Sequence, residues 1–135
     1  MATIKHFEDI QSWQKAREVC NYLGELIDKG RFKRSYRLIH QIEGSSGSIM
    51  DNIAEGFERG TKLEFIQFLG YAKGYCGELR SQLYRALDRK YITQEEVDYL
   101  RTYVMSISSL IQKLISYLFN SDIKGVRKKL APKEL

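Results

Sequence analysis

Apolar side chains recur three or four positions apart along four stretches of the chain, which is the spacing of one face of an α-helix. No stretch of useful length alternates apolar and polar residues with the period of two that a strand requires. The pattern predicts helices at about 9–29, 35–59, 62–90 and 94–119. Because short links join them, the simplest fold is all-α: an up-down-up-down antiparallel four-helix bundle over residues 1–120.

Capping residues mark where three of these helices begin. Asp9 is the expected N-cap of the first helix, because a carboxylate there can accept a free backbone N–H. Thr61 with Glu64 and Thr93 with Glu96 have the spacing of a capping box, in which each side chain accepts a backbone N–H of the other residue. These signals therefore place the starts of the third and fourth helices directly after Thr61 and Thr93.

Two of the helices carry more apolar surface than a single stripe. The main stripe of the first helix is expected at Ile10, Trp13, Ala16, Cys20, Leu23 and Ile27. Beside it lie Val19, Tyr22 and Leu26. The fourth helix has a heptad seam at Val97, Leu100, Val104, Ile107, Ile111, Leu114 and Leu118. Off that seam lies a second face, made of Tyr99, Tyr103, Leu110 and Tyr117. Tyrosines can line a bundle rim with their hydroxyls in water, but aromatic enrichment at interfaces favours a subunit contact.

The second helix contains a run of small residues that lowers its helix propensity, "GSSGS" at 44–48. We expect another helix to approach the backbone closely at Gly44 and Gly47, with the serines bonding to it. The alternative is that these residues are tolerated on a solvated face. Next to the apolar stripe runs a polar line of Ser48, Asn52, Glu55 and Arg59, in which Glu55 and Arg59 have the spacing of an i,i+4 ion pair.

Positive charge is concentrated in particular segments. The net charge is +5, and residues 61–90 and 121–135 each carry three more Lys and Arg than Asp and Glu. A further cluster lies at Arg31, Lys33, Arg34 and Arg37. Such a distribution can follow a phosphate backbone. We therefore take as candidate nucleic-acid contacts the residues Lys33, Arg34, Arg37, Lys73, Arg80, Arg85 and Arg89. The alternative for each is a solvated helix face.

Signals for enzymatic chemistry, metals and membranes are missing from the sequence. Neither His6 nor His40 follows a Glu by three residues, as a di-iron bundle site requires, and no nucleotide-binding glycine motif is present. Glu55 is the only candidate acid or base, and its pairing with Arg59 explains its charge. Cys20 and Cys76 fall on apolar positions and are expected to be core fillers. No apolar run approaches the roughly 18 residues of a membrane span. We expect a non-enzymatic cytoplasmic protein without cofactor, and a basic, frayed tail over 121–135.

Three stretches resemble a known family, the four-helix-bundle proteins encoded in intervening sequences of bacterial 23S ribosomal RNA genes. The first is "FEDIQSWQKARE" at 7–18, around Trp13. The second is "QIEGSSGSIMDNIAEGFERGTKLEFIQFL" at 41–69, where Ser48, Asn52, Glu55 and Gly56 match characteristic positions. The third is "AKGYCGELRSQLYRALDRKYI" at 72–92. The family includes relatives of the accessory protein of diversity-generating retroelements.

The resemblance implies a subunit that assembles as a ring-like homopentamer of basic character, suited to nucleic acid. It implies no known activity. The leading hypothesis is a non-enzymatic, oligomeric RNA- or DNA-binding protein of low sequence specificity. The alternative is a protein-interaction adaptor that docks a reverse transcriptase or another partner, as the resemblance to retroelement accessory proteins implies.

Overall fold

Four long helices make up most of the computed structural model, which describes residues 4–122. A short 3-10 helix, η1 (Phe7–Asp9), precedes α1 (Gln11–Asp28), α2 (Tyr36–Arg59), α3 (Lys62–Asp88) and α4 (Gln94–Phe119). No strand occurs within these described residues, which confirms the predicted all-α class. The predicted basic tail lies, from residue 123 onward, outside the described part.

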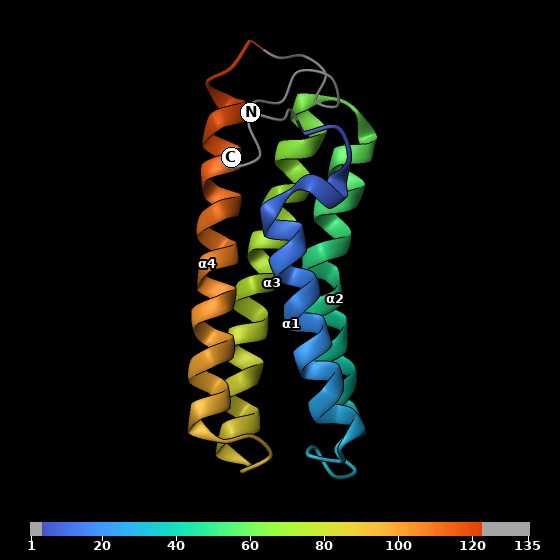
Figure 1. Ribbon diagram of the computed structural model, residues 1–135, viewed down its shortest axis with the longest axis vertical. Helices are drawn as coiled ribbons and strands as arrows, with labels where there is room; N and C mark the ends of the chain where they lie inside the picture. Colours follow the sequence, from blue (N-terminus) through green and yellow to red (C-terminus); the bar gives the residue numbers. More distant parts are fainter. Residues whose placement is uncertain (1–3, 123–135) are drawn as a thin grey trace.

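The helices lie side by side along the long axis of the molecule (Figure 1). Helix α1 packs against α2 and α4, and α3 packs against the same two helices. The links from α1 to α2 and from α3 to α4 lie at one end, and the link from α2 to α3 lies at the other (Figure 1). The N-terminal turn of α2 is therefore at the same end of the molecule as the C-terminal turn of α3.

Backbone N–H groups at the starts of α3 and α4 are capped by threonines, but the capping box predicted for both helices is complete only at α4. At α3 the Glu64 carboxylate accepts the Thr61 hydroxyl at 2.9 Å and not the Thr61 N–H. The Thr61 hydroxyl accepts the Glu64 N–H at 3.3 Å. At α4 the full capping box forms, with the Glu96 N–H on the Thr93 hydroxyl at 3.1 Å and the Thr93 N–H on the Glu96 carboxylate at 2.8 Å. These bonds satisfy donors that a helix leaves without intrahelical partners.

The predicted N-cap at Asp9 is wrong. Asp9 ends η1, and the N-cap of α1 is Ile10, whose side chain cannot accept a hydrogen bond. The Asp9 carboxylate instead accepts the N–H groups of Lys5 and His6, both at 3.2 Å. The reason is that the extended Ile10 separates η1 from α1, so that the carboxylate serves the turn before it.

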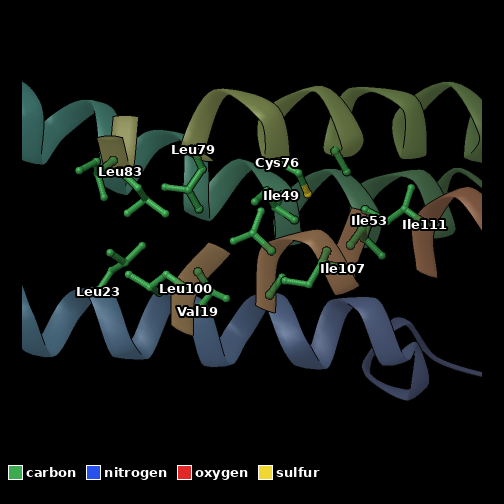
Figure 2. Packing of buried hydrophobic residues seen from close by; sticks show 14 of the residues in the cluster. Val19, Leu23, Ile49, Ile53, Cys76, Leu79, Leu83, Leu100, Ile107 and Ile111 are labelled. Atoms are coloured by element: carbon green, nitrogen blue, oxygen red, sulfur yellow. The ribbon is translucent and has the colours of Figure 1, made fainter. Parts of the chain in front are cut away.

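The core contains the predicted seam of α4 in full, but the predicted stripe of α1 is rotated. It also contains in full the stripe that helical spacing predicts for α3, at Phe65, Leu69, Ala72, Cys76, Leu79, Leu83 and Ala86. Val19 and Leu26 are buried, with 2% and 5% of their surface exposed, whereas Cys20 and Ile27 are only half-buried. The prediction that Val19 and Leu26 form surplus surface is therefore wrong. Figure 2 shows Val19 and Leu23 pointing into the bundle beside Leu100 of α4. Because α1 packs against both α2 and α4, its buried sector faces the space between them.

The small-residue run of α2 contributes through its serines and not through its glycines. Ser45 donates to the Gln82 side-chain oxygen at 2.6 Å, and Ser46 donates to the Ile42 carbonyl at 2.7 Å. A Cβ added to Gly44 or Gly47 would have no atom within 4 Å, so the predicted close approach at these two glycines is wrong within the subunit.

The close approach occurs nearer the C-terminal end of the same helix, at Gly56. A Cβ there would lie 2.6 Å from the Phe68 Cβ and 3.1 Å from the Phe65 ring. Only glycine therefore fits between α2 and α3 where the two helices converge on their short link.

Candidate nucleic-acid interface

Three of the seven candidate basic residues lie around the link that enters α2. Lys33 and Arg34 are exposed in the link, and Arg37 is exposed in the first turn of α2. Lys33 has φ of 53°, a left-handed conformation that turns the chain back toward the bundle. The α1–α2 link and the first turn of α2, which carry these three residues, are at the end of the molecule where α3 finishes (Figure 1).

Arg37 lines a surface hollow of about 390 Å³ together with two further candidates, Arg85 and Arg89. We call this hollow the arginine hollow. It is lined by Ser35, Arg37, Leu38, Arg85, Asp88, Arg89 and Tyr91. Arg85 donates to the Gln41 side-chain oxygen at 2.9 Å. The Arg89 guanidinium lies over the Tyr91 ring, 5.5 Å from its centroid. Both guanidinium groups are thus positioned by uncharged partners.

Local sequence explains how the arginine hollow forms. Helix α3 ends at Asp88, and Arg89 is its C-cap residue. Arg85 lies in the last turn, where a cation interacts favourably with the helix dipole. Tyr91 follows in the link with 8% of its surface exposed, so its ring is a fixed wall on which the aliphatic and guanidinium parts of Arg89 can rest.

Lys73 and Arg80 line a separate hollow of about 300 Å³, the α3–α4 groove. Its other lining residues are Met105, Ser108, Ser109 and Gln112, all from α4. Lys73 donates to the Gln112 side-chain oxygen at 2.8 Å. The structure thus sorts the seven predicted residues into the arginine hollow, the α3–α4 groove, and the pair Lys33 and Arg34, which line neither.

Arg31 is unlike the other basic residues of its cluster. Its guanidinium donates to both oxygens of Glu96, at 2.8 and 2.7 Å. The hydrogen bond to Glu96 raises the pKa of Arg31, and the same bond lowers the pKa of Glu96. Its charge is therefore neutralised within the subunit.

The polar line of α2 has the predicted ion pair. Arg59 donates to Glu55 at 2.9 Å, and it also reaches Glu64 in the first turn of α3 at 3.4 Å. The Asn52 amide donates to the Ser48 carbonyl at 2.7 Å. These contacts are structural, since they tie α2 to itself and to the start of α3.

The second apolar face of α4 is partly covered inside the subunit. Tyr99 stacks on Tyr22 of α1 with ring centroids 4.8 Å apart, and the Tyr103 hydroxyl donates to Glu18. Tyr117 packs against the core, and Leu110 is half-buried. Tyr99 keeps 47% of its surface exposed. Tyr99 therefore presents the largest aromatic surface of this face to solvent.

The two cysteines are free thiols. Cys76 is fully buried, and burial raises the pKa of its thiol to about 12. Burial also raises the pKa of Cys20. Over residues 4–122 no three His, Cys, Asp or Glu side chains are grouped as metal ligands would be. None of the four helices has the length and apolar character needed to cross a membrane.

Sequence reasoning missed the uncharged residues that shape both hollows. Gln41 and Tyr91 hold the arginines, and Gln112 holds Lys73. It also missed Asp88, which places a negative charge in the arginine hollow. No local signal marks Gln41 and Gln112, because each becomes significant only through a partner far away in the sequence. Asp88 and Tyr91 are close to Arg89 in the sequence, but only the fold places them in one hollow with Arg37.

Comparisons with known proteins agree with this architecture. A search of curated proteins finds no match to the chain. A crystal structure of a protein of unknown function from the S23 ribosomal protein family of Bacteroides thetaiotaomicron is similar, with a TM-score of 0.67 and 22% identity. The match covers 77% of this chain and 97% of that one, and it shows that the fold is shared. The family model for the 23S rRNA-intervening sequence protein matches residues 8–113, and the chain therefore belongs to that family.

Proposed function

We propose that this chain is a non-enzymatic, oligomeric nucleic-acid-binding protein of the cytoplasm that contacts the phosphate backbone of RNA or DNA with low sequence specificity. One observation carries the proposal. The ion pairs found among residues 4–122 use Arg31 and Arg59 and none of the seven candidate residues. Lys73, Arg85 and Arg89 are held by amides or a ring and not by carboxylates. Such cations keep their charge for an external anion.

Low sequence specificity follows from the kind of contact. Guanidinium and ammonium groups on a surface recognise phosphate, which is the same at every nucleotide. Base-specific readout needs an element that enters a groove and places side chains on base edges. The arginine hollow and the α3–α4 groove are concave, so they suit a projecting backbone better than the floor of a duplex groove.

Salt dependence of binding tests this proposal. Binding of a structured RNA should weaken steeply with salt, and Arg85→Gln or Lys73→Gln should each reduce the slope of log K against log salt by about 1. Lys5→Gln is the matched control, because Lys5 is an exposed lysine outside the seven and outside α4. Binding that does not depend on salt, or no binding at low salt, would refute the proposal.

The proposed assembly is a ring-like homopentamer of up-down-up-down antiparallel subunits, in contact through Tyr99, Tyr103, Leu110 and Tyr117. The exposed part of Tyr99 and the half-buried Leu110 support this face as the contact. Copies placed side by side would join their basic hollows into a longer track for a nucleic-acid backbone.

Light scattering tests the assembly. The wild-type protein should have a mass several times that of the 15.8 kDa chain, and Leu110→Glu should lower it by placing a charge in a desolvated contact. Thr102→Glu, at an exposed position of the same helix, should leave the mass unchanged. A monomeric wild-type protein at micromolar concentration would contradict the assembly.

The second candidate function is a protein-interaction adaptor, with a reverse transcriptase as one partner that the family resemblance suggests. It is favoured by two exposed apolar residues, Leu63 and Phe119, with 75% and 71% of their surfaces exposed. The start of α3 lies near the end of α4, because Lys62 donates to the Ser121 carbonyl at 2.9 Å. RNA binding by the purified protein alone separates the two candidates, since an adaptor would require its partner protein.

A further inference from the structure

The arginine hollow and the α3–α4 groove differ in how their charges are placed. Arg37, Arg85 and Arg89 come from the beginning of α2 and the end of α3, and all three line one concavity. Lys73 and Arg80 lie on one helix, seven residues and therefore about 10 Å apart along its axis. The α3–α4 groove therefore has two positive charges spaced along one helix, whereas the arginine hollow has three positive charges lining one concavity.

The net charge of the arginine hollow matches a dianion. Its three arginines and Asp88 give three positive charges minus one negative charge, which is a net charge of +2. A phosphate monoester carries about −1.5 to −2 at pH 7, whereas each diester of a nucleic-acid backbone carries a single negative charge. A single internal phosphate would leave the hollow with excess positive charge.

Hydrogen-bond donors remain available in the hollow. A guanidinium has five N–H donors in a fixed plane, and the Gln41 oxygen takes up only part of those of Arg85. Arg89 lies over the Tyr91 ring, and none of the ion pairs among residues 4–122 uses its guanidinium. Ser35, which also lines the hollow, makes no capping hydrogen bond with its side chain. Arginine pairs commonly hold phosphate through two parallel bonds of this kind.

We propose that the arginine hollow is a discrete site for a phosphate monoester, the group at a phosphorylated end of a nucleic-acid strand. This inference rests on the proposed nucleic-acid-binding function and deepens it: the α3–α4 groove contacts internal diesters, and the arginine hollow captures a strand terminus. At about 390 Å³ the hollow is near the lower end of ordinary ligand sites, so it accepts a terminal phosphate with its sugar and not a folded domain.

The test compares short RNA strands of one sequence that carry a 5′-phosphate, a 3′-phosphate or hydroxyls at both ends. Fluorescence anisotropy of an internally labelled strand should show about tenfold tighter binding of one phosphorylated form, the gain expected from an additional charge-assisted contact. Which form is preferred identifies the end that enters the hollow. Inorganic phosphate should compete with that form and not with the hydroxyl strand.

Variants assign the effect to the hollow. Arg37→Gln and Arg85→Gln should abolish the difference between the phosphorylated and hydroxyl strands. Arg80→Gln, in the α3–α4 groove, should weaken both strands equally and preserve the difference. Arg37 is exposed at the first turn of α2, so its variant is expected to fold normally. An unchanged circular dichroism melt verifies this.

The outcomes separate this inference from the proposed function. Equal and measurable affinity for all three strands would overturn the monoester site and leave backbone binding intact. A difference that survives in Arg37→Gln and Arg85→Gln would also overturn it. Failure to bind any strand at low salt would refute the nucleic-acid function itself.

Discussion

Arg31 and Glu96 are 65 positions apart in the sequence and form a two-bond ion pair, with N–O distances of 2.8 and 2.7 Å. Glu96 also caps α4 by accepting the Thr93 N–H. One carboxylate therefore fixes the first turn of α4 and the link that leaves α1. Lys33 and Arg34 follow Arg31 in that link. The Arg31–Glu96 ion pair therefore also positions these two candidate contacts, which line neither the arginine hollow nor the α3–α4 groove.

Glu96→Gln should lower the free energy of unfolding at pH 7 by about 1 kcal/mol, the value of a well-formed but partly exposed pair. Arg31 lowers the pKa of Glu96 in the folded state below its ordinary value of 4.5. The stabilisation is therefore fully present above the ordinary value and is lost as the pH falls through the lowered folded value.

Urea unfolding of the wild-type protein and of Glu96→Gln, at pH 7 and pH 3, measures this loss of stabilisation. The difference between wild type and Glu96→Gln should shrink at the lower pH. Glu95→Gln removes an exposed neighbour in the same turn and controls for the helix dipole. A difference that stays constant with pH would contradict the role of the ion pair.

Gly56→Ala should destabilise the fold by about 1–3 kcal/mol, because its Cβ would overlap the Phe68 Cβ at 2.6 Å. Gly44→Ala should have the opposite effect and raise the free energy of unfolding by about 0.5–1 kcal/mol, since open space surrounds that position in α2. Thermal melts of the two variants compare one substitution at two sites of one helix. Equal effects would show that α2 and α3 are not closely packed at Gly56.

Gln82→Leu should cost about 1–3 kcal/mol, because it removes the principal partner of the buried Ser45 hydroxyl. The double variant Ser45→Ala with Gln82→Leu should recover part of this cost, since it removes both polar groups of the pair and leaves neither without its partner. Chemical denaturation of the two single variants and the double variant gives the coupling energy. Strict additivity would mean that the hydrogen bond contributes no coupling.

Cys76 should resist alkylation at pH 8 in the native protein. Its thiol is buried and has a pKa of about 12, so the reactive thiolate is scarce and shielded from the reagent. Mass spectrometry after iodoacetamide treatment, with and without urea, measures the reaction. Cys20 is only half-buried and should react first. Rapid native labelling of Cys76 would indicate that the bundle opens locally around α3.

Periodicity along the chain was sufficient to predict the four helices and two of their buried stripes. The seam of α4 and the stripe of α3 are recovered in full, because every position of each lies on the side of its helix that faces the core. The pairing of Glu55 with Arg59 and the capping by Thr93 were also predictable, since both depend on residues within one turn. The candidate site was predictable only as a set of basic residues.

The sequence by itself determined the number of helices, their approximate ends and where the positive charge is concentrated, because these are local properties of the chain. Only the tertiary structure decided that Val19 is core and Cys20 is half-buried, since two flanking helices set the phase of α1. It likewise decided that Gly56, and not Gly44, is the point of close approach. Arg31 is neutralised by Glu96, while Arg37 and Arg85 meet in one hollow. Whether an arginine is paired with a carboxylate, and whether two arginines line one hollow, depends on distances between separate helices. The spacing of residues along one helix does not give these distances.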